Sequence, residues 1–107
     1  MSYKLYQDDL PANLNLGPVV ACDCEFTGLN PPKDKLCLIQ LCSENSKEVH
    51  IVQFVNRENY KSPNLVKLLI NPDLSFPEAY VNGEIKIENG SLLDFLDLTF
   101  KNSSTPE

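Results

Sequence analysis

The chain has 107 residues, of which 42% are hydrophobic and 22% charged, and its formal net charge is −6 at pH 7. That length and composition suit one globular domain with a modest core, and they exclude a chain that is disordered along most of its length. The acidic balance disfavours broad electrostatic capture of nucleic acid, and the sequence has no run of about 18 apolar residues that would cross a membrane. We therefore expect a soluble protein with no membrane partner.

The residues before Val19 predict only minor elements. Tyr3 to Leu5 has the pattern of a short edge strand, and the stretch from Asp8 to Pro11 indicates a turn or a brief helical segment. Gly17 and Pro18 then interrupt any regular element. The main body of the fold is therefore expected to begin at residue 19.

Val19 to Phe26 predicts a central strand, because it is apolar on both faces except for two acids. Asp23 and Glu25 are two residues apart, and alternate residues of a strand share a face, so their carboxylates should lie a few ångströms apart. Two acids in an apolar strand cost desolvation and mutual repulsion, and a bound divalent cation relieves both. Because carboxylates suit the hard ions Mg²⁺ and Mn²⁺, the pair predicts a metal site.

Two further strands and a helix follow. The loop from Thr27 to Lys35 leads into a buried strand from Leu36 to Cys42 and then into a third strand from Val49 to Phe54. Short connections favour antiparallel pairing of these strands. Ser62 is expected to cap a helix that has Pro63 at its first position. The residues expected to share one core are Val19, Ala21, Leu38 or Ile39, Leu65 and Leu69.

The chain after Leu74 carries weaker signals. Asn82 and Gly83, flanked by short alternating runs, predict a β-hairpin. A short apolar element of undetermined type covers residues 92–100, and residues 101–107 have the composition of a disordered segment.

One stretch resembles a known family. The segment C-D-C-E-F-T-G-L-N-P, followed by K-L-C-L-I-Q-L, is similar to the first motif of the DEDD 3′-5′ exonucleases in the form that ribonuclease D has. The resemblance runs from about Leu5 to Leu74 and implies an α/β, ribonuclease H-like fold. We expect a truncated version, with a three-stranded antiparallel sheet and one helix in residues 1–74. An atypical tail in residues 75–100 and a disordered end in residues 101–107 would follow.

The resemblance also implies a function. Asp23 and Glu25 would be catalytic and would hold part of a two-metal site for Mg²⁺ or Mn²⁺. Thr27, Gly28 and Leu29 match the turn that receives the 3′-terminal nucleotide. The implied activity is metal-dependent 3′-5′ exonucleolytic cleavage of RNA 3′ ends, as in transfer RNA processing in the cytoplasm.

The later motifs of that family are not recognised after Leu74. The resemblance implies a further buried strand and two helices that carry acids. Tyr80 and Glu84 imitate the spacing of the last motif, and Asp94 or Asp97 could be offered as the second acid, but each lacks the expected context. Three hypotheses therefore stay open. The chain is an exonuclease that is weak or inactive alone, a non-catalytic remnant or interaction module, or one part of a homodimer or of a complex whose partner supplies the missing half.

Four cysteines raise the question of a zinc site or a disulfide. The spacing of Cys22, Cys24, Cys37 and Cys42 fits no familiar zinc pattern. Free cysteine commonly packs as a small hydrophobic residue, so we expect four reduced, structural thiols. Reduced thiols are typical of the cytoplasm.

We predict that thiol titration of the purified protein in denaturant counts four free thiols and that unfolding releases no zinc. Stoichiometric zinc, or a count below four under anaerobic purification, would contradict this expectation.

Overall fold

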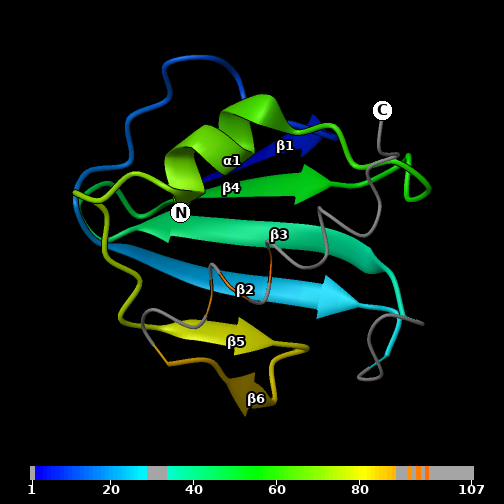
Figure 1. Ribbon diagram of the computed structural model, residues 1–107. Helices are drawn as coiled ribbons and strands as arrows, with labels where there is room; N and C mark the ends of the chain where they lie inside the picture. Colours follow the sequence, from blue (N-terminus) through cyan, green and yellow to red (C-terminus); the bar gives the residue numbers. More distant parts are fainter. Residues whose placement is uncertain (1, 29–33, 89–91, 93, 95, 97–107) are drawn as a thin grey trace.

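The computed structural model describes residues 2–28, 34–88, 92, 94 and 96. Within these residues the chain forms a mixed sheet with helix α1 on one side, and Leu92, Asp94 and Leu96 are also helical (Figure 1). No helix in this part of the chain is long and apolar enough to cross a membrane. The elements are β1 (Ser2–Gln7), β2 (Val20–Phe26), β3 (Leu36–Ser43), β4 (Glu48–Gln53), α1 (Pro63–Leu69), β5 (Ala79–Val81) and β6 (Ile85–Lys86).

The sheet has the strand order β1-β4-β3-β2-β5-β6. Its centre is the predicted unit: β2 pairs antiparallel with β3, and β3 pairs antiparallel with β4. The sheet is larger than the predicted three strands. The edge strand expected at Tyr3 to Leu5 is confirmed as β1, which adds parallel to β4, while β5 adds parallel to β2 and β6 pairs with β5. Parallel strands are joined by long connections, so no turn signal in the sequence indicates which strands pair in parallel.

One face of the sheet carries the core. Alternate residues of β2, namely Val20, Cys22 and Cys24, are buried there and pack with Leu65 and Leu69 of α1. In Figure 1, α1 lies over β1 and β4. The expectation that Val19 and Ala21 join this core was wrong, since they share the strand parity of the two acids. Of the two β3 candidates, Ile39 is the buried one, whereas Leu38 is only half-buried.

The start of α1 is stabilised from a distance. Ser62 occupies the N-cap position as predicted, but its hydroxyl makes no cap hydrogen bond and instead donates to the Asp8 carbonyl. The carboxylate of Asp9 accepts hydrogen bonds from the amides of Asn64 at 3.1 Å and Leu65 at 2.8 Å. A side chain at the end of β1 therefore satisfies helix amides that have no partner within the helix.

The chain after Leu74 extends the same sheet. The predicted hairpin is confirmed: β5 and β6 pair around a turn in which Asn82 has φ 53° and Gly83 has φ 65°. The sequence did not reveal β5 as a further buried strand, because its three residues are too few to show a period. Leu92 and Leu96 pack in the core, and residues 101–107 lie outside the described residues.

We predict that Asp9→Ala lowers the free energy of unfolding by about 1 kcal/mol, because it removes the acceptor for two α1 amides. Urea denaturation followed by circular dichroism measures the change. Asp73→Ala is the matched control, since Asp73 is exposed, lies after the end of α1 and takes no part in its N-cap. Equal destabilisation by the two substitutions would contradict the remote cap.

Candidate active site

The two acids lie on the face of β2 opposite the core. Val20, Cys22 and Cys24 are buried in the core, so alternation places Asp23 and Glu25 on the other face. β2 is flanked on both sides, by β3 and by β5, which fixes its twist and its register. The prediction that the acids share one face of a central strand therefore agrees with the observed strand.

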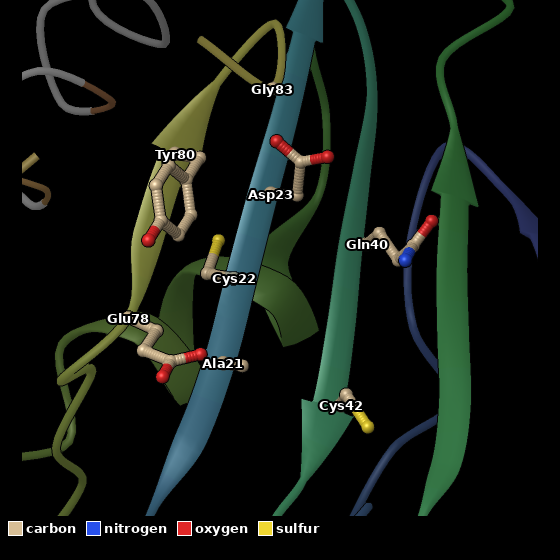
Figure 2. A pocket seen from close by; sticks show the side chains of 8 residues that line it. All are labelled: Ala21, Cys22, Asp23, Gln40, Cys42, Glu78, Tyr80 and Gly83. Carbon is tan, nitrogen blue, oxygen red and sulfur yellow. The ribbon is translucent and has the colours of Figure 1, made fainter. Parts of the chain in front are cut away.

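Asp23 stands in a row of side chains from three strands. It is in register with Gln40 on β3 and with Tyr80 on β5. These residues border a shallow pocket of about 230 Å³ (Figure 2). The remaining lining residues are Ala21, Cys22, Cys42, Glu78 and Gly83.

The carboxylates carry buried oxygens that the described residues do not satisfy. Oδ1 of Asp23 and Oε2 of Glu25 are inaccessible to solvent and have no hydrogen-bond partner within the described part of the chain. Buried polar atoms are nearly always paired, and those without a partner in the protein commonly bind an ion or a water molecule. Two carboxylate oxygens on one strand face are the ligands that Mg²⁺ or Mn²⁺ prefers, so the donor set fits a divalent cation.

The electrostatics of the pair agree with this fit. Burial raises the pKa of the Glu25 carboxyl, and the charge of Asp23 raises it further. A cation between the two carboxylates would favour their ionised forms, and would so act against the rise in the pKa of Glu25 that burial and the charge of Asp23 cause. Among the described residues no three His, Cys, Asp or Glu side chains are arranged so that they could hold a metal ion together, so the pair forms only part of a coordination shell.

The cysteines beside the acids belong to the core. The sulfur atoms of Cys22 and Cys24 are 3.8 Å apart and buried. The hydrogen bond to Cys22, followed by burial, holds the pKa of the Cys24 thiol well above its ordinary value. The Cys24 thiol therefore favours the neutral form, which is a poor metal ligand.

The turn after β2 is held by the far end of the following loop. The hydroxyl of Thr27 donates to Oδ1 of Asp34 at 3.0 Å and accepts from the amide of Lys35 at 2.9 Å. A Cβ atom on Gly28 would lie 2.6 Å from Oδ2 of Asp34, so any larger residue at this position would have to displace that carboxylate. Leu29, the third residue expected to meet substrate, lies outside the described residues.

The acids that imitate the later motifs are not brought to the pair. Glu84 sits in the exposed hairpin turn, and the side chain of Asp94 is exposed. Asp97 lies outside the described residues.

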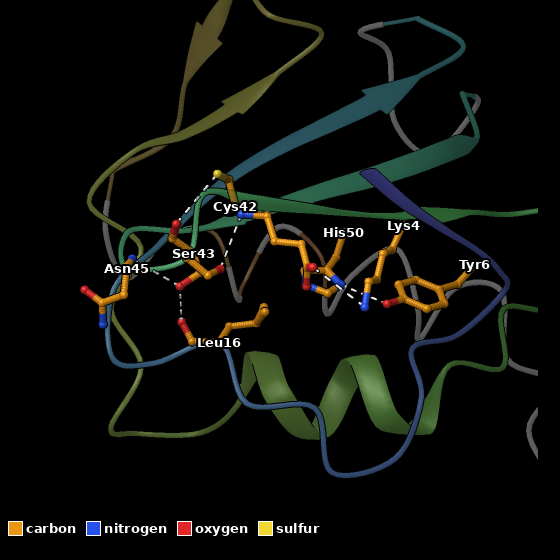
Figure 3. A network of polar contacts seen from close by, with 9 residues as sticks. Lys4, Tyr6, Leu16, Cys42, Ser43, Asn45 and His50 are labelled. Atoms are coloured by element: carbon orange, nitrogen blue, oxygen red, sulfur yellow. Dashed lines mark hydrogen bonds and ion pairs between the residues drawn. The ribbon is translucent and has the colours of Figure 1, made fainter. Parts of the chain in front are cut away.

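The single histidine is occupied within the fold, on the opposite face from the acids. His50 is 2% exposed, its Nε2 lies 2.9 Å from a carboxylate oxygen of Glu48, and its Nδ1 lies 2.9 Å from the hydroxyl of Tyr6 (Figure 3). Lys4 extends this network: its Nζ lies 3.7 Å from Oε2 of Glu48. Both ring nitrogens therefore have structural partners.

Sequence reasoning missed Asn82. It was recognised as a turn residue, yet its carboxamide lies against the end of β2, where it contacts the backbone at Phe26 and Gly28. An asparagine before glycine is a turn signal in itself, so the sequence offered no separate sign of this contact.

Comparison with known proteins places this geometry in a family. Residues 7–76 match the family model described as 3′-5′ exonuclease. The structure of Brucella melitensis NrnC is similar, with 35% identity, a TM-score of 0.61 and coverage of 69% of this chain and 36% of that chain. NrnC with bound Mg²⁺ gives the same values, and NrnC bound to pGG gives 36% identity and a TM-score of 0.59.

A nuclease in its apo form shares the fold over 97% of this chain and 46% of its own, with 24% identity and a TM-score of 0.66. The search of curated proteins returned no significant match. This chain spans 36% of the length of NrnC. The α/β, ribonuclease H-like class expected from the sequence is confirmed. From the matched residues, the strand that bears the acids and the shared fold, we conclude that this chain belongs to the 3′-5′ exonuclease family.

Proposed function

We propose that this chain carries the first metal-binding motif of a 3′-5′ exonuclease of the ribonuclease D type, acting on RNA 3′ ends such as those of transfer RNA precursors in the cytoplasm. The observation that carries the proposal is the pair of buried oxygens on Asp23 and Glu25, which have no partner among the described residues. An acid pair with a purely structural role would pair these two oxygens with hydrogen-bond donors, because burying a carboxylate oxygen without a partner is costly. NrnC with bound Mg²⁺ supports a divalent ion as the missing partner.

The acids would hold the metal ions, and the turn after them would contact the substrate. In two-metal hydrolysis, ions about 4 Å apart generate the attacking hydroxide and stabilise the leaving oxygen. Asp23 and Glu25 would hold that metal centre, and the fixed strand would orient their oxygens. The backbone of Thr27 and Gly28 would meet the terminal sugar, and Leu29 would contact the base. The NrnC complex with pGG supports a nucleic-acid end as the substrate.

The turn also limits what Thr27 can contribute. Its hydroxyl donates to Asp34 and accepts from Lys35, so its hydrogen-bonding capacity is largely used within the protein. We therefore assign to the hydroxyl of Thr27 the positioning of the turn, and to the backbone of Thr27 and Gly28 the contact with the substrate.

A second candidate is a non-catalytic module that needs a partner chain. The specific observation is the exposure of Tyr3 at 66% and Leu5 at 65%, on the same face of edge strand β1. Alternate apolar side chains on a free sheet edge favour association with another chain or a second copy. Size-exclusion chromatography with light scattering distinguishes a monomer from a homodimer.

We predict that Mn²⁺ binds to the wild type with a dissociation constant in the millimolar range, because few protein oxygens are present to replace its water ligands. Asp23→Ala should remove this binding, and Asp73→Ala should leave it intact. Paramagnetic broadening of amide resonances near β2 would measure it. The metal site is refuted if Asp23→Ala and the wild type bind Mn²⁺ equally.

We further predict that the isolated chain does not shorten a 5′-labelled single-stranded RNA in the presence of Mg²⁺, since the two acids complete only part of a two-metal site. Gel analysis of the labelled products is the measurement. Shortening from the 3′ end that Glu25→Gln abolishes would show that the chain is an active exonuclease and needs no acids from another chain. Shortening that Glu25→Gln leaves unchanged would contradict the assigned site.

A further inference from the structure

The side chain of Asn82 is directed into the fold although it sits at a hairpin turn. Its backbone amide donates to the Cys24 carbonyl at 2.7 Å, which continues the pairing of β5 with β2 by one bond. The residue is half-buried, and its φ of 53° turns the chain away from β2. The carboxamide is thereby left facing the segment that follows the acids.

Both ends of this carboxamide bind the backbone of that segment. Oδ1 of Asn82 accepts a hydrogen bond from the amide of Phe26 at 2.7 Å. Nδ2 of Asn82 donates to the carbonyl of Gly28 at 3.3 Å. One side chain therefore binds the backbone at both ends of the segment from Phe26 to Gly28.

These contacts occur where the regular sheet ends. The register between β2 and β5 ends at Cys24 and Val81, and the register between β2 and β3 shifts between Glu25 and Phe26. A register shift disrupts the ladder of hydrogen bonds and bends the strand locally. The direction of the side chains beyond it therefore depends on further contacts. The carboxamide of Asn82 supplies one by offering an acceptor and a donor where β5 would otherwise have continued.

We propose that Asn82 is a positioning residue for the acid pair and for the turn that receives the substrate, an inference that rests on the proposed function. The amide of Phe26 belongs to the same peptide group as the carbonyl of Glu25. Fixing that group fixes the direction in which the Glu25 side chain leaves the strand. The bond to Gly28 fixes the backbone that would meet the terminal nucleotide.

The residue type is constrained twice. Asparagine and aspartate tolerate a positive φ better than other residues with side chains. Aspartate can accept from an amide but cannot donate to a carbonyl when ionised, and it would add a third charge near Asp23 and Glu25. Glycine would keep the turn but remove both contacts. Asparagine combines the turn geometry with both hydrogen bonds.

The test compares three variants of the full chain at a temperature where each is folded by circular dichroism. Asn82→Gly keeps the positive φ and removes the carboxamide. Asn13→Gly makes the same change at φ 64°, in a loop outside the proposed site. Asn82→Asp keeps an acceptor for the amide of Phe26. The readouts are amide hydrogen exchange at Phe26 and the dissociation constant for Mn²⁺.

Asn82→Gly should speed exchange at Phe26 and weaken Mn²⁺ binding about tenfold, as loss of an outer support of a metal ligand does. Asn13→Gly should change neither. Asn82→Asp keeps the acceptor for the amide of Phe26, so exchange at Phe26 should stay close to that of the wild type. The positioning role is overturned if Asn82→Gly leaves both the exchange at Phe26 and the Mn²⁺ affinity unchanged, or if Asn82→Asp speeds exchange at Phe26 as much as Asn82→Gly does. Failure of the wild type to bind Mn²⁺ would instead overturn the proposed function, and the positioning role with it.

Discussion

The structure depends on the cost of placing two like charges on one central strand. β2 has to bury Val20, Cys22 and Cys24 in the core while it presents Asp23 and Glu25 on the opposite face. Only a strand held on both sides can keep that alternation, because a slip of one residue would drive the acids into the core. The flanking strands β3 and β5 therefore serve the site as much as the fold.

The turn beyond the acids is held both by residues close in sequence and by a residue far from it in sequence. On one side, Asp34 and Lys35 hold Thr27 through a loop that is close in sequence. On the other side, Asn82 reaches the turn from a hairpin more than fifty residues away. The motif that gives the family its sequence signature is thus shaped by residues outside the motif.

Local patterns predicted much of this arrangement. The alternation of acids in an apolar strand located the candidate site, and short loops indicated the antiparallel centre of the sheet. The edge strand β1 was expected, but the parallel pairing of β1 with β4 and of β5 with β2 was missed, because these pairings form between segments far apart in sequence and leave no local pattern. The capping role of Asp9 was hidden for the same reason: Ser62 is the better local candidate, and only the folded chain brings the carboxylate to the helix. The strand parity of the core was misjudged because Val19 and Ala21 are as apolar as their neighbours.

The parallel pairing of β1 with β4 has a consequence for how the protein folds. Ser2 pairs with Glu48 and Gln7 with Gln53, so every contact of this edge closes a loop of more than forty residues. Contacts of such long sequence separation slow folding, because the entropy of loop closure is lost before they form. The pairing of β1 must therefore wait until β4 has been synthesised and brought into place. The support that Asp9 gives to α1 is correspondingly expected to be a late event on the folding pathway.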